Sequence, residues 1–235
     1  MPVWYSRRAN KMKLIAKDVK KDFPRASKSS NYFTAVQALD FELKSGKMIE
    51  ITGRSGSGKS TLLNILAGML TPTAGKVLLD DTDLYALDEK SLSRLRNEKI
   101  GLIPQGHTAL QSLTVLENVI LPAILYKKET PPEDRAKELL EQVGIINLAN
   151  AKPNELSGGE LRRMAIARAM LLHPGILLAD EPTAGLDNEN TLAVLSLLRK
   201  ATDDGAAVLL VTHENEAAQF ADQVYTMDGG KLVES

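Results

Sequence analysis

The glycine-rich stretch GRSGSGKS, residues 53–60, has the residue types and spacing best suited to phosphate chemistry. It fits G-x-x-x-x-G-K-[ST] between a short apolar run and a helical pattern, the context that a phosphate-binding loop requires. The glycines let backbone N–H groups face the phosphates of a nucleotide, and the dipole of the following helix adds positive potential. This context disfavours the alternative of a flexible Gly/Ser loop. The predicted nucleotide-binding residues are Gly53, Arg54, Ser55, Gly56, Ser57, Gly58, Lys59, Ser60 and Thr61.

Two carboxylates follow a buried strand pattern in the stretch ILLADE, residues 176–181. Ligands of α/β sheets bind at the carboxyl ends of the strands, so Asp180 and Glu181 should face the phosphate-binding loop. There the Lys59 ammonium would reach the β- and γ-phosphates, and the Ser60 hydroxyl and Asp180 would hold Mg²⁺. Glu181 could polarise an attacking water. Taken alone, a strand followed by Asp-Glu is as often a solvated loop start, but the glycine-rich loop favours the catalytic interpretation.

The stretch LSGGE, residues 156–160, places a serine and two glycines directly before a helical run. Such a helix start could be a second phosphate site or a second half of the first one. Ordinary helix capping by Ser157 is the simplest alternative. The motif resembles the signature of ATP-binding cassette (ABC) ATPases. Further similarities are Gln105 in IGLIPQG, the AGLD stretch at 184–187 and His213 after LLVT, all in the family's order from about residue 13 onward.

This resemblance implies roles for residues that spacing alone does not assign. Gln105 would bind nucleotide and metal, and His213 would sense the γ-phosphate, which completes a catalytic set with Glu181 and Lys59. The cofactors would be ATP and Mg²⁺. The signature residues would close the ATP site of a second copy of the chain in a head-to-tail, ATP-dependent dimer. They are Ser157, Gly158, Gly159 and Glu160.

The family also has an aromatic residue that stacks on adenine shortly after the first strand. Phe23 stands at that place, and Tyr32 and Phe33 are rivals. The sequence departs from the family at two positions. Pro104 precedes Gln105 where an aromatic residue is usual, and Glu50 interrupts the strand before the glycine-rich loop, where we expect it to face the less buried side.

The elements that must position these residues form three successive patterns. Apolar alternation predicts antiparallel strands at 13–19 and 38–44, joined by an exposed loop at 24–33. Helical periodicity predominates from about 88 to 172, including a capping box at Thr114 and Glu117. Buried strands and helices then alternate up to a hairpin around Gly229-Gly230. The predicted fold is α/β: a P-loop NTPase of the ABC type with a mixed sheet core, an antiparallel β subdomain and a helical subdomain.

The predicted domain is 13–235, and residues 1–12 are expected to be a loose extension. His173 stands at the end of a predicted helix, where a histidine interacts favourably with the helix dipole. His107 is expected to be exposed to solvent. The formal net charge of −1 gives no reason to expect a nucleic-acid partner. The chain has no cysteine and no apolar run of membrane-spanning length, so a cytoplasmic location is expected.

A single cassette without membrane spans implies integral-membrane permease subunits as partners, with this chain peripheral on the cytoplasmic face of the membrane. The stretch SLTVLENVILPAIL, residues 112–125, resembles ATPase subunits of lipoprotein-release, macrolide-export and antimicrobial-peptide-resistance systems. The alternative is a non-transport ABC ATPase coupled to a membrane partner, of the cell-division-signalling type. The expected function is ATP hydrolysis that powers a transporter through ATP-driven dimerisation.

Overall fold

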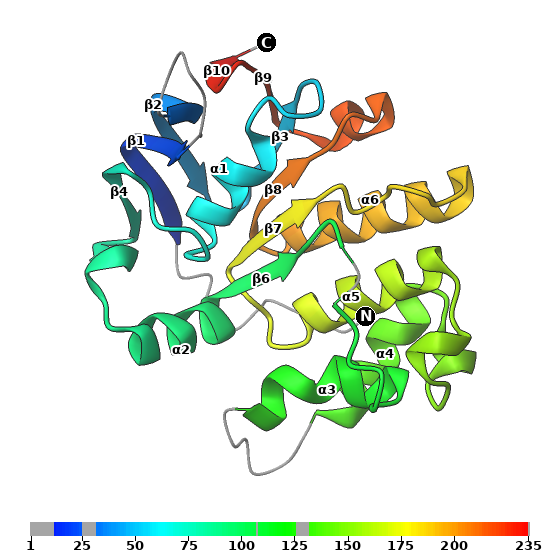
Figure 1. Ribbon diagram of the computed structural model, residues 1–235. Coiled ribbons are helices and arrows are strands. Elements are labelled where there is room, and N and C mark those ends of the chain that lie inside the picture. The colour runs from blue at the N-terminus through cyan, green and yellow to red at the C-terminus, as the bar shows by residue number, and fades with distance from the viewer. Residues whose placement is uncertain (1–11, 25–31, 107, 126–131, 235) are drawn as a thin grey trace.

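The computed structural model describes residues 12–24, 32–106, 108–125 and 132–234, and its strands form two sheets (Figure 1). One is a four-stranded antiparallel sheet in the order β2-β1-β4-β5, and the other is six-stranded in the order β10-β9-β3-β8-β7-β6. The strands are β1 (Lys13–Pro24), β2 (Tyr32–Lys44), β3 (Met48–Thr52), β4 (Ala74–Leu79), β5 (Thr82–Asp83), β6 (Ile100–Ile103), β7 (Ile176–Asp180), β8 (Ala207–Val211), β9 (Gln223–Asp228) and β10 (Lys231–Glu234).

The two antiparallel strands predicted near the N-terminus are confirmed but longer than their apolar alternation indicated. The pairing of β1 and β2 continues to Pro24 opposite Tyr32. Both ends of the predicted loop at 24–33 therefore belong to these strands. The middle of that loop lies outside the described residues. Met12, assigned from sequence to the extension, is buried and exchanges hydrogen bonds with Ser45.

The six-stranded sheet is the scaffold of the site because five of its strands run parallel. β3 pairs in parallel with β8 and β9, and β7 pairs in parallel with β8 and β6. Every residue of β7 and β8 is buried, as expected for parallel strands covered on both faces. The carboxyl ends of β3 and β7 therefore meet at one edge, where Gly53 and Asp180 lie. The terminal hairpin of β9 and β10 is confirmed as predicted.

Two apolar clusters cover the two faces of this sheet. Ile49, Ile51 and Leu178 contribute to one cluster, together with α1 and the antiparallel sheet. Met48, Val208 and Leu210 contribute to the other, together with α3, α4, α5 and α6. The α-helices are α1 (Lys59–Leu66), α2 (Glu89–Lys99), α3 (Val115–Leu125), α4 (Glu133–Gln142), α5 (Gly158–Met170) and α6 (Asn188–Asp203). Single turns of 3-10 helix are η1 (Leu84–Ala86), η2 (Ile146–Leu148) and η3 (Pro153–Glu155), and η4 (Asn215–Phe220) is longer.

Among its described residues, the region from 88 to 172 contains one strand beside its helices. β6 pairs with β7 and so joins the parallel core, whereas α3, α4 and α5 contact one another below the sheet in Figure 1. A run of four apolar residues is too short to carry a strand period, which explains why β6 was missed. The capping box at the start of α3 is confirmed: the Thr114 N–H donates to Glu117 Oε2 and the Glu117 N–H to Thr114 Oγ1. The last helical element before the terminal hairpin is the 3-10 helix η4.

Glu50 contradicts the expectation that it faces a less buried side. Its exposed fraction is 0%, and neither carboxylate oxygen has a hydrogen-bond partner among the described residues. Burial raises the pKa of Glu50 to about 7. The reason is that β3 is a central strand with both faces covered, so neither face of it meets solvent. Within the described residues, no helix is both long and apolar enough to span a bilayer.

Candidate functional site

The glycine-rich loop opens a cavity of about 620 Å³ at the carboxyl edge of the parallel strands. The structure brings residues from six separate segments to this cavity. They are Phe23, Phe33 and Ala35 from the antiparallel sheet, Gly53, Arg54, Ser55, Gly56, Gly58, Lys59, Ser60 and Thr61 from the loop and α1, and Gln105, Glu181 and His213 from the ends of β6, β7 and β8. Of the predicted loop residues, Ser57 does not line it and is buried.

Two glycines fix the loop against the rest of the fold. Gly53 has a φ of 138° and Gly58 a φ of 109°, both in the region that side chains disfavour. A Cβ atom would lie 2.2 Å from the Met227 carbonyl oxygen at Gly53 and 2.2 Å from the Ala35 carbonyl oxygen at Gly58. At Gly56, by contrast, a Cβ atom would meet nothing within 4 Å. The loop is thus anchored at both ends and open in its middle, where a phosphate could approach.

The Lys59 ammonium forms hydrogen bonds with the backbone of the glycine-rich loop. Its Nζ donates to the carbonyl oxygens of Gly53 at 2.6 Å and Arg54 at 3.0 Å. These hydrogen bonds keep the ammonium beside the loop. They offset part of the cost of burying a charged side chain. A phosphate in the cavity would offer Lys59 a charged acceptor in place of two neutral carbonyls, and such charge-assisted bonds are stronger.

Asp180 has the features of a metal-binding carboxylate. It is 4% exposed, and within the part of the chain that the structure describes its Oδ1 atom has no hydrogen-bond partner. Burial raises the pKa of Asp180, and a hydrogen bond from Ser60 opposes that rise. The described residues contain no cluster of three or more His, Cys, Asp or Glu side chains that could enclose a metal. One carboxylate and one hydroxyl nevertheless fit Mg²⁺, which keeps several waters and takes phosphate oxygens as further ligands.

Glu181 is held in a strained and specific position. Its φ is +51°, which is costly for a residue with a side chain, and its N–H donates to the Val211 carbonyl at 2.8 Å. One carboxylate oxygen lies 2.8 Å from His213 Nδ1, and the other accepts from the Thr212 hydroxyl at 3.2 Å. The hydrogen bond to Glu181 raises the pKa of His213. The structure thus joins the predicted base and the predicted phosphate sensor directly.

Several polar residues at this edge were missed by sequence reasoning. Thr212 orients Glu181, and the Thr183 hydroxyl donates to Glu214. The Arg162 guanidinium donates to the carbonyl oxygens of Glu181 and Gln105. Thr212 and Glu214 flank His213 in sequence, and that adjacency was the available signal. The only signal that the sequence offered for Arg162 is its place as one of two adjacent arginines after LSGGE.

The aromatic candidates for adenine stacking differ in their placement. Phe23 and Phe33 are register partners on β1 and β2, and both line the cavity. The ammonium of Lys21 lies 5.2 Å from the centroid of the Phe23 ring. Tyr32 does not line the cavity and is 64% exposed. The geometry favours the two phenylalanines, and the stacking role itself stays a prediction.

Ser157, Gly158 and Gly159 of the LSGGE stretch line a second cavity, of about 530 Å³, whereas Glu160 does not line it. Among the described residues, none lines both this cavity and the first. The Ser157 hydroxyl accepts from the Glu160 N–H and donates to Glu160 Oε2, which also accepts from the Ser157 N–H. Ser157 therefore caps α5, and its hydrogen bonds lower the pKa of Glu160. The cavity is lined by Ser157, Gly158, Gly159, Arg162, Arg163, Ala184, Gly185, Leu186, Asp187 and Asn190.

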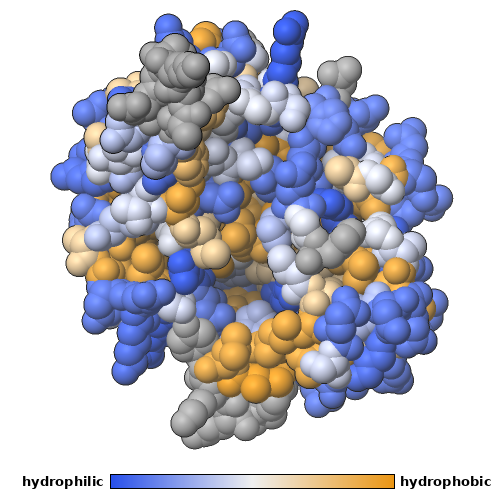
Figure 2. All heavy atoms as spheres, in the orientation of Figure 1, coloured by the Kyte–Doolittle hydropathy of each residue, from blue (hydrophilic) through white to orange (hydrophobic). Residues whose placement is uncertain are grey.

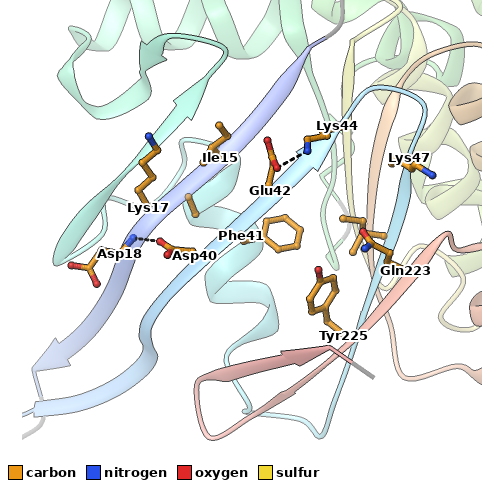
Figure 3. A pocket seen from close by; sticks show the side chains of 12 residues that line it. Ile15, Lys17, Asp18, Asp40, Phe41, Glu42, Lys44, Lys47, Gln223 and Tyr225 are labelled. Carbon is orange, nitrogen blue, oxygen red and sulfur yellow. Dashed lines mark hydrogen bonds and ion pairs between the residues drawn. The ribbon is translucent and has the colours of Figure 1, made fainter.

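A larger cavity, of about 670 Å³, lies elsewhere, between the antiparallel sheet and β9 (Figure 3). Its aromatic pair, Phe41 and Tyr225, packs edge to face with ring centroids 6.0 Å apart. Glu42 pairs with Lys44, and Asp40 accepts from the Asp18 N–H. This cavity lacks the glycine-rich loop and the paired carboxylates Asp180 and Glu181, so we place the chemistry at the smaller cavity.

Of the two remaining histidines, only His173 is among the described residues, and it lines neither of the two cavities. His173 is exposed just beyond α5, with a φ of +51°, and His107 lies outside the described residues. Pro104 directly follows β6, so it stands between the sheet and Gln105.

Comparisons with known proteins are consistent with this geometry. The profile of a family described as ABC transporter matches residues 36–184. The lipoprotein-releasing system ATP-binding protein LolD of Pseudomonas syringae pv. tomato is 43% identical over 202 residues, 85% of this chain and 89% of that protein. The protein of the same name from Aquifex aeolicus is 41% identical, with 86% and 90% covered.

Solved structures are similar over nearly the whole chain. The dimeric structure of MJ0796, a bacterial ABC transporter cassette, superposes with a TM-score of 0.88 at 35% identity, covering 94% of this chain and 98% of that one. The dimeric post-hydrolysis state of the same cassette, bound to ADP and Pi, superposes with a TM-score of 0.87 at 35% identity and the same coverage.

Proposed function

Since this chain belongs to the ABC transporter family of ATPases, we propose that its ATP hydrolysis requires Mg²⁺ and drives the release of lipoproteins through membrane permease subunits. The observation that carries the hydrolytic part is the arrangement of Glu181. Its carboxylate is oriented by Thr212 and His213 in the cavity of the glycine-rich loop. The printed name of the relatives supports the lipoprotein part.

The residues of the cavity would share the chemistry as follows. The loop N–H groups and Lys59 would bind the phosphates, and Glu181 would orient and polarise the attacking water. His213 would contact the γ-phosphate. Asp180, Ser60 and Gln105 would hold Mg²⁺, which when bound neutralises charge on the phosphate oxygens. Phe23, with Phe33 beside it, would stack on adenine.

We further propose that two copies assemble head to tail, so that Ser157, Gly158, Gly159 and Glu160 of one copy close the nucleotide site of the other. Among the described residues, the signature and the glycine-rich loop line two different cavities of one chain, which supports a signature that acts on the phosphate of another protomer. The solved dimers of the similar cassette support this assembly. The signature lies on α5, within the helical subdomain proposed at about 88–172.

The permease subunits would dock where apolar side chains remain exposed on α3. Figure 2 shows hydrophobic atoms gathered over the position that α3 has in Figure 1. Ile124 is 51% exposed and Leu125 is 65% exposed. Exposed apolar residues that gather in this way mark interaction sites. The chain would thus lie at the cytoplasmic face of the membrane as a peripheral subunit.

The test measures hydrolysis and association separately. The purified chain should release phosphate from ATP with Mg²⁺ and lose that activity in EDTA, and tagged chain should co-purify from membranes with an integral-membrane subunit. Activity that is unchanged in EDTA would contradict the metal requirement. Purification without any membrane subunit would contradict the transporter role.

A further inference from the structure

Arg162 connects three elements of the catalytic edge through one guanidinium group. It lies on α5, five positions after Ser157. One terminal nitrogen donates to the carbonyl oxygen of Glu181, which follows β7, and the other donates at 2.8 Å to the carbonyl oxygen of Gln105, which follows β6. A planar guanidinium can make two such bonds at once in a fixed geometry, whereas a lysine ammonium cannot reproduce that fork.

Arg162 also spans the two cavities. It lines the signature cavity, while both of its acceptors line the nucleotide cavity. Because a helix is rigid over one turn and a half, Ser157 and Arg162 must shift together when α5 shifts. A movement of the signature is therefore passed on to the backbone that carries Glu181 and Gln105.

Three carboxylates stabilise the positive charge of Arg162 at this place. Burial lowers the pKa of Arg162, and the carboxylates of Glu181, Asp180 and Glu214 oppose that effect. An arginine remains protonated in any case, so a positive charge is fixed among three carboxylates of the catalytic edge. A half-buried arginine at such a place is costly to desolvate, and its hydrogen bonds to two carbonyls offset part of that cost.

We propose that Arg162 is a positioning residue that couples the signature helix of each protomer to its own catalytic glutamate and to Gln105. In the head-to-tail dimer, the signature contacts the nucleotide of the partner. Arg162 therefore links the occupancy of one ATP site to the alignment of Glu181 in the other. This inference rests on the proposed ATPase function and on the proposed dimer.

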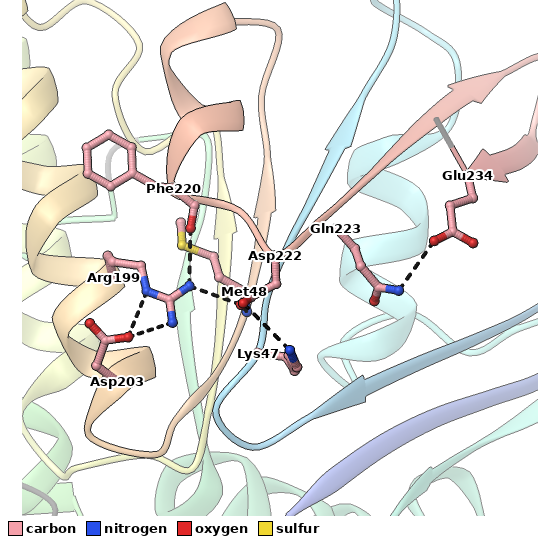
Figure 4. A network of polar contacts seen from close by, with 8 residues as sticks. All are labelled: Lys47, Met48, Arg199, Asp203, Phe220, Asp222, Gln223 and Glu234. Atoms are coloured by element: carbon pink, nitrogen blue, oxygen red, sulfur yellow. Dashed lines mark hydrogen bonds and ion pairs between the residues drawn. The ribbon is translucent and has the colours of Figure 1, made fainter.

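Arg199 is the matched control, because its guanidinium is also a bridge but lies at the opposite end of the sheet (Figure 4). It donates to the Phe220 carbonyl at 3.2 Å, to Asp222 at 3.0 Å and to Asp203. Asp222 in turn accepts from the N–H of Met48, the first residue of β3. Replacing Arg199 removes a structural bridge of the same kind without touching the catalytic edge.

The experiment compares full-length wild type, Arg162→Ala, Arg162→Lys and Arg199→Ala by steady-state hydrolysis and by amide hydrogen exchange. Arg162→Ala should lower kcat by about 10- to 100-fold, as expected when reacting groups are misplaced. Its KM for ATP should stay within about twofold of wild type. Arg162→Lys should recover part of kcat. Arg199→Ala should lower the melting temperature but leave kcat unchanged at a temperature where it is folded.

Hydrogen exchange gives a readout that does not depend on turnover. Arg162→Ala should speed exchange around Gln105 and after β7, whereas Arg199→Ala should speed it around Phe220 and Asp222. The proposal is overturned if Arg162→Ala keeps the wild-type kcat, or if its exchange around Gln105 is unchanged. It is also overturned if kcat falls only in proportion to the loss of folded protein. A folded wild type that hydrolyses no ATP would instead contradict the proposed function and remove the basis for the coupling.

Discussion

At the scale of single residues, the chemistry depends on how the Glu181 carboxylate is held. It contacts Thr212 on one side and His213 on the other, and its backbone is strained at a φ of +51°. Strain of this kind persists only where the surroundings over-determine the conformation. The anchoring hydrogen bond from the Glu181 N–H to Val211 belongs to the neighbouring strand, so the sheet itself fixes the base.

Replacing Glu181 by Gln should preserve ATP binding and remove turnover. The amide has nearly the shape of the carboxylate but cannot accept a proton, and loss of a positioned base is expected to cost about 10²- to 10⁴-fold in rate. The same change replaces the carboxylate that raises the pKa of His213 by a neutral amide, whose oxygen is a weaker acceptor, so that pKa should fall. Phosphate release and an NMR titration of the histidine measure the two effects. Hydrolysis near the wild-type rate would contradict the assignment of Glu181 as the base.

Replacing His213 by Ala should lower hydrolysis and leave ADP affinity almost unchanged. A γ-phosphate is present in ATP and absent from ADP, so a side chain that contacts only this group discriminates between them. Binding of ATP and ADP to the variant, measured by calorimetry beside its hydrolysis rate, provides the check. An equal loss of affinity for both nucleotides would indicate that His213 has a structural role through Glu181.

At the scale of elements, β3 carries a buried carboxyl group directly before the glycine-rich loop. Glu50 sits opposite Leu210 and Val224 in the register of the sheet, and no described residue forms a hydrogen bond with either carboxylate oxygen. Its pKa in the folded chain is about 7, above the ordinary value of 4.5. A raised carboxyl pKa means that the folded state binds the proton more tightly than the unfolded state does. The chain therefore loses stability as pH rises from about 4.5 to about 7, and the loss stays complete above that range.

Replacing Glu50 by Gln should thus stabilise the chain more at pH 8 than at pH 5. The pH-dependent loss in wild type can reach about 1.4 kcal/mol per pH unit, and an amide does not titrate. Urea unfolding at the two pH values measures the difference. Glu42→Gln, which changes an exposed carboxyl on β2, is the control. An equal effect of Glu50→Gln at both pH values would show that the carboxyl does not change its ionisation on folding.

β3 and the loop that follows it show which features the local sequence predicts and which it does not. The loop after β3 was predicted because its glycines, lysine and serine stand at a spacing that one mechanism requires. The capping boxes at Thr114 and Ser157 are equally local, since each is completed within four residues. The burial of Glu50 was not local, because it depends on helices and strands that cover β3 from elsewhere in the chain.

Other features were missed for the same physical reason. β6 is too short to show a period, and it is a strand because β7 lies beside it. Arg162 bonds to carbonyl oxygens that follow two different strands, and no pattern around α5 indicates which strands end there. The sequence thus predicted which residue types form the site, whereas the contacts that position them come from tertiary packing.

At the scale of the whole molecule, α3 offers an apolar surface on the side away from the antiparallel sheet (Figures 1 and 2). Replacing Leu125 by Glu should lower association with membrane subunits by about tenfold, roughly 1.4 kcal/mol, because a charge would have to be buried at the interface. Hydrolysis by the isolated chain should not change. Val233→Glu, at an exposed apolar residue on β10, is the control. Co-purification from membranes provides the measurement, and an equal loss in both variants would contradict docking at α3.

The nucleotide site and the signature lie at different cavities of one chain. We therefore expect the transport cycle to depend on closure of each nucleotide site by a second copy of the chain. An ATP bound by Lys59 and the loop of one copy is proposed to be covered by Ser157 of the other, so nucleotide would join the copies and hydrolysis would release them. Among the described residues of one chain, Ser157 and the glycine-rich loop line different cavities, so we propose that each chain alone is an incomplete enzyme.

The most direct measurement mixes a Lys59→Ala chain with a Ser157→Arg chain, both also carrying Glu181→Gln to prevent turnover, and isolates the dimer that forms with ATP. If the signature acts on the partner, each heterodimer has one doubly altered site and one intact site. The mixture should then yield an ATP-bound heterodimer, whereas neither chain should dimerise alone. If the signature acted within its own chain, every protomer would be defective, and the absence of an ATP-bound heterodimer from the mixture would contradict closure between two copies.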